Sequence, residues 1–369
     1  MKLVKANEFD SDKLCDFLKK SLYPNKINLM IHRPQGFFAP YLIHSRDYVT
    51  YYLVDKNNEI QAMASLLFKK VKLYGEEQTV GYATDLRVGS QKAILNWTKH
   101  FLPALEKERD ERNCKYIFST INKYQNDAYK SFLRPRSKRR VMPRYYLFRK
   151  FNVSTIHGIL PFAPKTLKNL NIRRANVDDL EALQAYICKK QTHRPIAEIN
   201  RCSDLKQIFC DWPNFLISDF MIALDFKDKI VGCMSLWDGS VLQSYEPKKY
   251  HQKAMTFKQT LNFLSFLRSG RRLPKKNEKL NMIQLSHIYV DNPDIHYSLL
   301  RSAWEKTPRT HFLTYAHFES ELATQVPRSF IHTNTGYGLY CILTPNDPIP
   351  DFLTPTYLGE APDFEFAYI

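Results

Sequence analysis

The feature that most constrains the fold is a strand–turn–strand pattern that occurs once in each half of the 369-residue chain. In the first half, the β-rich run YVTYYLVD (48–55) precedes the polar turn KNN and a second β-rich run. In the second half, FMIALDF (220–226), KDK and IVGCMSLWD (230–238) repeat the arrangement. Short polar turns between runs of β-branched and aromatic residues predict hairpins. The pattern therefore indicates two consecutive units with the same plan.

The elements that follow the first hairpin alternate between strand and helix. A long strand from Glu59 turns at residues 74–77 and returns as the strand 78–88. Apolar residues at helical spacing between Ile94 and Leu105 predict a helix, despite Pro103 within it. The strand KYIFSTI (115–121), a helix that begins near Asn126 and the strand YYLFRKF (145–151) complete this half.

The second half shows the same alternation with one addition. We expect a strand at LNIRRA (170–175), an amphipathic helix over 177–191 and the hairpin described above. An inserted helix, QTLNFLSFLRS (259–269), comes before the strand 280–290. A helix over 295–306 and two strands, 311–318 and 336–343, end the half.

Proline and glycine mark the boundaries between these units. His157-Gly158 and the pair Pro161 and Pro164 are expected to interrupt regular structure between the halves. We therefore expect a first domain over 1–155, a linker over 156–169 and a second domain over 170–344. Residues 345–369 contain five prolines and are expected to form an extended tail.

The net charge of +17 implies an anionic partner. The excess is concentrated, because residues 101–150 hold fourteen Lys and Arg against five Asp and Glu. The seven cysteines are scattered and form no CxxC, which favours reduced thiols and a cytoplasmic location. No signal peptide, membrane span or metal-ligand spacing is found in the sequence, so we predict neither a membrane anchor nor a metal.

Several segments resemble the acetyltransferases of the GNAT superfamily. YLVDKNNEIQAMASLLF and VGYATDLRV are similar to the central segment of that family, and FSTINKYQNDAYKSFL resembles its next strand and helix. IRRANVDDLEAL, IVGCMSLWD, WDGSVLQSY and RRLPKKNEKL resemble segments of bacterial tandem GNAT-like proteins. The resemblance implies an α/β (α+β) fold of two consecutive GNAT-like domains, each a mixed central sheet flanked by helices. It also implies acetyl-CoA, or another acyl-CoA, as co-substrate and an amine as acceptor.

The family binds coenzyme A through the motif Arg/Gln-x-x-Gly-x-Gly/Ala, whose backbone N–H groups hold the pyrophosphate at a helix N-terminus. The first half has Gly89-Ser90-Gln91-Lys92-Ala93, which keeps one glycine, whereas the second has Asp291-Asn292-Pro293-Asp294. Both loops depart from the motif, but the acids and the proline make the second less suitable. By resemblance, the cofactor-binding residues are Leu86, Arg87, Val88, Gly89, Ser90, Gln91, Lys92, Ala93 and Asn126.

The resemblance also indicates catalytic candidates. Asp85 is a candidate general base for the ammonium proton, and Tyr129 is a candidate acid for the leaving thiolate. The alternative is a strand-end aspartate bonded to backbone and a packing tyrosine. In the second half we expect an acyl cleft with side chains from two neighbouring strands: His287, Tyr289, Tyr315 and His317. Hydrogen-bonded core histidines are the alternative here.

A basic run, RPRSKRR, leaves a second function open. Its cations can contact nucleic-acid phosphates, an acidic protein or the coenzyme; they are Arg134, Arg136, Lys138, Arg139 and Arg140. The leading hypothesis is an acyl-CoA-dependent N-acyltransferase. The alternative is a non-catalytic tandem GNAT-like protein that binds nucleic acid or an acidic partner through its basic surfaces.

Overall fold

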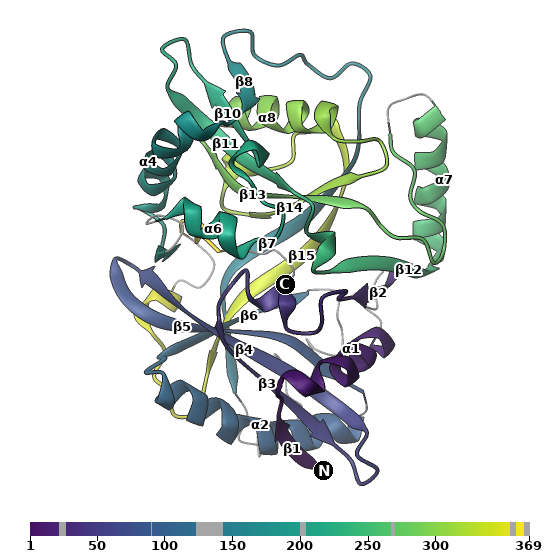
Figure 1. Cartoon of the computed structure of the whole chain (residues 1–369), viewed down its shortest axis with the longest axis vertical. Coiled ribbons are helices and arrows are strands. Elements are labelled where there is room, and N and C mark those ends of the chain that lie inside the picture. Colours follow the sequence, from purple (N-terminus) through teal and green to yellow (C-terminus); the bar gives the residue numbers. More distant parts are fainter. Residues whose placement is uncertain are drawn as a thin grey trace.

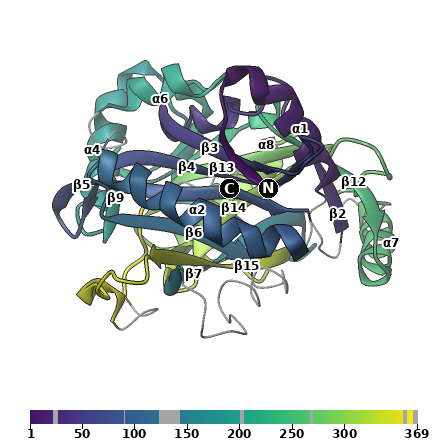
Figure 2. The same ribbon diagram turned by 90° about the horizontal axis from the view of Figure 1, so that it is seen from below.

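The computed structural model describes residues 1–21, 27–89, 91–122, 143–199, 204–266, 270–354 and 359–364. Within these residues the centre of the molecule is a mixed sheet of thirteen strands. In Figure 1, β3, β4, β5 and β6 lie in the lower part of the molecule, β8, β10, β11 and β13 lie in the upper part, and β7 and β15 run between them. Helices flank the sheet in both halves (Figures 1 and 2). The predicted fold class is therefore confirmed.

The first half contains the predicted hairpin and the elements after it. Its strands and helices are β1 (Lys2–Lys5), α1 (Ser11–Lys20), β2 (Ile27–His32), β3 (Asp47–Val54), β4 (Ile60–Leu73), β5 (Glu76–Val88), α2 (Gln91–Glu111), β6 (Tyr116–Asn122) and β7 (Arg144–Ile159). The β4–β5 turn has positive φ angles at Tyr74 and Gly75, as a two-residue hairpin loop requires. β1, α1 and β2, which lie before residue 48, were not predicted from the sequence.

The second half repeats this order with the inserted helix α7. Its strands and helices are β8 (Asn171–Arg174), α4 (Leu180–Gln191), β9 (Ile196–Glu198), α6 (Leu205–Asp211), β10 (Phe220–Leu224), β11 (Ile230–Trp237), β12 (Ser244–Tyr250), α7 (Gln252–Phe266), β13 (Met282–Val290), α8 (Pro293–Lys306), β14 (Phe312–Phe318) and β15 (Phe330–Leu343). Short 3₁₀ helices are η1 (Glu8–Asp10), η2 (Ala39–Tyr41), η4 (Val177–Asp179), η5 (Ile217–Asp219), η6 (Gly239–Val241), η7 (Leu322–Thr324) and η8 (Asp351–Leu353).

The two halves exchange their closing strands. The sheet order is β1-β3-β4-β5-β6-β15-β7-β14-β13-β11-β10-β8, with β9 added beside β4. The closing strand of the first half, β7, pairs with β14 of the second half, and β15 pairs with β6 of the first. β7 and β15 also pair with each other along most of their length. The halves consequently share one sheet.

The expected break at His157 and Gly158 is wrong, because both residues lie inside β7; Gly158 pairs with Ile331 of β15, and His157 lies at a shift in that register. Regular structure ends only after Ile159, in the segment that contains Pro161 and Pro164. The strand continues because β15 pairs with it as far as Ile159, and such long-range pairing outweighs the local weakness of glycine. The boundaries 1–155 and 170–344 stay a prediction.

A repeated helix cap shows how the two halves correspond. Asn7 begins η1 and Asn176 begins η4; each side chain accepts a backbone N–H of the following turn. An aspartate three residues later, Asp10 or Asp179, accepts the backbone N–H of the asparagine in return. This reciprocal capping satisfies N–H groups that a helix start leaves free. The shared tetrad Asn-x-x-Asp therefore begins the first helical segment of each half.

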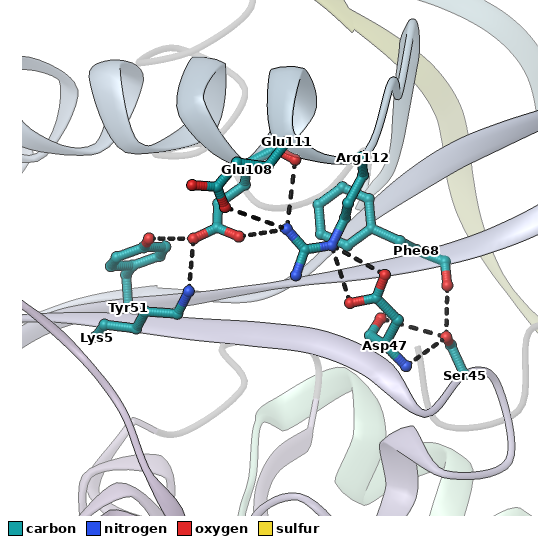
Figure 3. A network of polar contacts seen from close by, with 8 residues as sticks. All are labelled: Lys5, Ser45, Asp47, Tyr51, Phe68, Glu108, Glu111 and Arg112. Carbon is teal, nitrogen blue, oxygen red and sulfur yellow. Dashed lines mark hydrogen bonds and ion pairs between the residues drawn. The ribbon is translucent and has the colours of Figure 1, made fainter.

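Helix α2 is fixed to the sheet by a buried carboxylate. Figure 3 shows Glu108 of α2 pointing at Tyr51, Lys5 and Arg112. Glu108 is fully buried and accepts hydrogen bonds from the Tyr51 hydroxyl at 2.5 Å, Lys5 Nζ at 2.9 Å and Arg112 Nη1 at 2.6 Å. Arg112 also pairs with Asp47 at 2.9 Å. These bonds hold the helix across the strands of the first half (Figure 2).

The C-terminal segment packs into the molecule. Among the described tail residues, Leu353, Ala361 and Phe364 are buried in a core cluster with side chains of β4, β5, β6 and β7. The backbone N–H of Asp363 donates to the carbonyl of Ile196 in β9 at 2.7 Å. The tail therefore joins β9 of the second half to the core of the first half.

Candidate functional site

The sheet opens between β5 and β6, which run parallel. Their pairing extends from Val80 opposite Tyr116 to Ala83 opposite Ser119. Beyond that pair, β5 continues to Val88 and β6 continues to Asn122. Residues 84–88 thus leave the β6 ladder, and that edge of β5 faces the opening. A diverging parallel pair at the end of two strands is a common place for ligands in α/β folds.

A mainly apolar cavity lies at this opening. Its volume is about 40 Å³. The residues that line it come from β4, β5, β6, α2, β7 and β15; they are Ala64, Ala83, Thr84, Leu86, Trp97, Phe101, Leu102, Leu105, Ser119, Pro143, Tyr145 and Ile342. The Trp97 and Phe101 rings of α2 stack with centroids 4.5 Å apart. The opening is therefore a narrow, aromatic-walled space.

The predicted cofactor loop lies beside the opening. Gly89 follows β5 directly, and its N–H donates to the Gln61 carbonyl at 2.8 Å. A Cβ atom at Gly89 would approach that carbonyl oxygen to 3.3 Å, so the glycine permits a close crossing of β4 and the loop. Helix α2 begins at Gln91 and has no acidic residue in its first turn. Its N-terminus therefore has the polarity that favours an anion.

The other predicted cofactor residues lie around the same loop. Leu86 lines the cavity, Arg87 donates to the Leu86 carbonyl at 3.0 Å, and Val88 pairs with Ala62. Ala93 is buried in α2. Gln91 and Lys92 belong to the first turn of that helix, whereas Ser90 and Asn126 lie outside the described residues.

Asp85 lies at a β-bulge in β5 and is held in a buried ion pair. The register between β4 and β5 shifts here, and Asp85 takes a left-handed φ of 52°. Its Oδ2 accepts Arg33 Nη2 at 2.7 Å and the Tyr41 hydroxyl at 2.6 Å. Burial alone raises the pKa of Asp85, but the charges of Arg33 and Arg87 and the Tyr41 hydrogen bond outweigh it and lower that pKa. The alternative expected for Asp85 was a bond to the backbone, but its carboxylate is bonded by the side chains of Arg33 and Tyr41.

The ion pair extends into a network that joins the two halves. Arg33 Nε donates to Gln243 Oε1 at 2.8 Å, and Gln243 lies just before β12 in the second half. Tyr41 also bonds Ser65 of β4 at 2.7 Å. Arg33, Tyr41 and Gln243 were not predicted, because no local pattern signals partners so far apart in the sequence.

The second half has a matching bulge at His287. The register between β11 and β13 shifts there, and His287 has a φ of 48°, close to that of Asp85. Ser235 of β11 bonds Ser286 at 2.7 Å and His287 Nδ1 at 3.2 Å, so it takes the place that Ser65 has in the first half. The two bulges show that β5 and β13 are equivalent strands.

The second opening differs from the predicted cleft. β13 and β14 pair only as far as Gln284 opposite Thr314, and His287 and Tyr289 line a cavity of about 70 Å³ beyond that pair. On β14, however, the cavity meets Ala316 and Phe318. The prediction that Tyr315 and His317 line this cleft together with His287 and Tyr289 is therefore wrong, because alternate residues of a strand face opposite sides of the sheet.

Tyr315 and His317 lie instead on the α8 side of the sheet. Tyr315 is packed in the core cluster that contains α8, and its ring lies 5.5 Å from that of His317 and 5.7 Å from that of His296. His317 Nε2 pairs with the Ser154 hydroxyl at 2.9 Å. These residues match the alternative of core histidines.

The chain itself occupies one side of the second opening. Pro362, Asp363 and Phe364 of the tail line the cavity, and Asp363 Oδ1 accepts the Tyr289 hydroxyl at 2.8 Å. Helix α8 is also unsuited to phosphate. Asn292 caps it by accepting the N–H groups of Asp294 and Ile295 at 3.0 Å, so these donors are already used.

Two predicted features cannot be placed. Tyr129 and the basic run from Arg134 to Arg140 lie outside the described residues. Within the described ranges no three His, Cys, Asp or Glu side chains gather as a metal site. No helix in the same ranges is long and apolar enough to cross a membrane.

Comparison with known proteins shows similarity in structure only. No protein-family model and no curated protein matches the chain. A Saccharomyces cerevisiae N-myristoyltransferase with bound myristoyl-CoA aligns with a TM-score of 0.56 and 9% identity, over 92% of this chain and 79% of that chain. The GCN5-related glucosamine N-acetyltransferase region of a fungal multi-domain β-N-acetylglucosaminidase also aligns with a TM-score of 0.56. Its identity is 12%, over 93% of this chain and 38% of that chain.

These likenesses cover more than nine-tenths of this chain. At such low identity they concern the fold alone. The chain has the GNAT superfamily fold, built from two GNAT-like halves.

Proposed function

We propose that the protein is an acyl-CoA-dependent N-acyltransferase that binds the acyl-CoA in its first half. The observation that carries this proposal is the opening of β5 from β6 directly beside the N-terminus of α2. The helix end offers backbone donors for the pyrophosphate, and the opening offers a path for the thioester. N-myristoyltransferase, a structural neighbour, binds myristoyl-CoA in its crystal structures, which supports an acyl-CoA as co-substrate.

The reaction proposed is attack of a neutral amine on the thioester carbonyl. The C–N bond forms as the C–S bond breaks. Coenzyme A leaves as its thiolate, and the amine proton passes to a base. Negative charge develops on the carbonyl oxygen in the transition state, and a preorganised N–H can stabilise it. We assign this role to the backbone of β5 near Val88, on the edge that β6 leaves uncovered.

The geometry favours a positioning role for Asp85. Its lowered pKa makes the carboxylate a weak proton acceptor, and its Oδ2 is engaged by Arg33 and Tyr41. The same bonds hold the bulge residue in its left-handed conformation, which costs energy in a non-glycine residue. We therefore propose that the Arg33–Asp85 pair fixes the β5 edge against which the thioester lies.

The size of the cavity favours a short acyl group. A volume of about 40 Å³ is well below the roughly 300–1,000 Å³ of pockets that enclose larger ligands. Trp97 and Phe101 close its α2 side. This supports acetyl, rather than a long fatty acyl chain, as the group transferred.

A thiol-release assay tests the proposal. The full chain is mixed with acetyl-CoA or myristoyl-CoA and a panel of primary amines and N-terminal peptides, and free coenzyme A is measured. We expect amine-dependent release from acetyl-CoA and at least about tenfold less from myristoyl-CoA, because the long chain does not fit the cavity. No amine-dependent release from any acyl-CoA would contradict the proposal.

A pair of variants places the site. Ala83→Trp fills the first opening, and Gln284→Trp is the matched change at the last paired residue of β13. We expect Ala83→Trp to abolish release and Gln284→Trp to retain it, with circular dichroism showing that both fold. The opposite pattern would move the active site to the second half.

A further inference from the structure

Helix α7 stands at the edge of the molecule and has two apolar sides. In both Figure 1 and Figure 2 it lies apart from the other helices. One side packs on the protein through Ala254 and Leu261, which are buried, and through Phe257 and Leu264. A helix at the surface of a protein normally presents polar residues on its other side. The outer side of α7 departs from this rule.

The outer side of α7 carries three exposed apolar side chains. Met255, Phe263 and Phe266 are 44%, 65% and 78% exposed. At 3.6 residues per turn these positions fall on one face. The residues between them on that face, Gln252, Thr256 and Gln259, are exposed and uncharged. We call this set of six residues the α7 outer face; it contains no charge that would oppose contact with an apolar phase.

The sequence around α7 contains lysine and arginine residues but no acidic residue. From Pro247 to Asn277 the chain contains no Asp or Glu. Among the described residues of this span, the exposed cations are Lys249, Lys253, Arg272, Lys275 and Lys276. Three other described cations are used internally: Lys248 Nζ pairs with Glu246 at 2.6 Å, Lys258 Nζ donates to the Pro274 carbonyl at 2.6 Å, and Arg271 Nη2 donates to the Trp304 carbonyl at 2.8 Å. The exposed cations are therefore the ones available to an anionic partner.

Exposed aromatic and aliphatic side chains on an uncharged helix face, with exposed lysine and arginine residues in the adjoining sequence, are suited to a membrane interface. The apolar side chains enter the boundary of the acyl region, and the cations meet anionic headgroups. We propose that the α7 outer face binds the surface of an anionic phospholipid bilayer. This contact is independent of the acyl-CoA opening.

Vesicle flotation with the full chain tests the proposal. The probes are vesicles of phosphatidylcholine alone and of phosphatidylcholine mixed with phosphatidylglycerol, each at low and high salt. We expect the protein to float with the mixed vesicles, and binding to fall as salt rises because the headgroup attraction is screened. No flotation with the mixed vesicles, or equal flotation with phosphatidylcholine alone, would overturn the proposal.

Matched variants locate the contact. Phe263→Ser combined with Phe266→Ser removes the two most exposed rings of α7, while Phe226→Ser removes a ring that is 81% exposed on the β10–β11 turn. The α7 variant should bind mixed vesicles at least roughly tenfold more weakly, because each buried CH₂ contributes about 0.8 kcal/mol. Phe226→Ser should bind like the wild type. Unchanged binding of the α7 variant, or an equal loss in Phe226→Ser, would refute the assignment.

Discussion

The buried pair of Arg33 and Asp85 offers a quantitative test of the first-half site. Arg33→Met keeps much of the side-chain length but removes the charge and all of its donors. The side chains of Arg33 and Asp85 are 1% and 6% exposed, so water cannot replace the lost partner. The Gln243 amide oxygen and the Phe37 carbonyl lose their donors as well. Breaking such a pair typically costs about 3–5 kcal/mol, and we expect that loss in the free energy of unfolding at pH 7.

The same variant has a defined pH dependence. In the wild type the folded pKa of Asp85 is lowered, so its contribution to stability is present above the unfolded pKa and is lost as pH falls through the folded pKa. Without Arg33, burial raises that pKa, and the variant carries an unpaired carboxylate that protonation relieves. The stability difference between the two proteins should therefore shrink as pH falls from 7 towards 4.

Urea unfolding, followed by circular dichroism at several pH values, measures these differences. A second variant, Arg33→Met with Asp85→Asn, should be more stable at pH 7 than Arg33→Met alone because no buried charge is left unpaired. Asn also tolerates the left-handed backbone at this position. A loss below about 1 kcal/mol, typical of an exposed pair, or a difference independent of pH would refute the reasoning.

Two further predictions concern buried titratable groups. Glu108→Gln should lower the free energy of unfolding at pH 7 by about 1–3 kcal/mol. Burial raises the pKa of Glu108, but hydrogen bonds from Tyr51, Lys5 and Arg112 lower it below 4.5. The loss should therefore shrink as pH falls from 4.5 through the folded pKa, which urea unfolding at a series of pH values from 7 downwards measures. His296, whose ring nitrogens have no hydrogen-bond partner among the described residues, has a pKa lowered by burial to about 3. The unfolded chain binds a proton at His296 near pH 6.5, whereas the folded chain does not. The wild type should therefore lose about 2 kcal/mol of stability between pH 7 and pH 5 that His296→Leu does not lose, and equal losses in the two proteins would contradict this.

Local patterns were sufficient to predict most of the elements of the fold. Polar turns flanked by β-branched residues located β3, β4, β10 and β11, and helical spacing located α2 even though it contains Pro103. The first helix could also have been found, because the capping tetrad that begins it, Asn7 to Asp10, recurs at Asn176 to Asp179. The exchange of β7 and β15 could not, since a strand carries no local signal of which distant strand it will pair with.

The candidate site was predicted in part for the same reason. The loop after β5 was recognised from its glycine and its resemblance to a family motif. The bulges at Asp85 and His287 arise from the register between strands, which single residues do not reveal. The partners of Asp85, Arg33 and Tyr41, come from the segment between β2 and β3, and Arg33 in turn bonds Gln243 of the second half. Tyr315 and His317 are absent from the predicted cleft because alternate residues of β14 face opposite sides of the sheet.

The central claim is that acyl-CoA binds at the N-terminus of α2. Calorimetric titration of acetyl-CoA into the wild type, Lys92→Glu and Lys99→Glu tests it most directly. Both substitutions reverse one charge on α2, but Lys92 belongs to its first turn and Lys99 is exposed two turns later. We expect the wild type to bind, Lys92→Glu to bind about tenfold more weakly because an acid replaces a cation near the phosphates, and Lys99→Glu to bind like the wild type. No binding by the wild type, or equal affinities for all three proteins, would contradict the account.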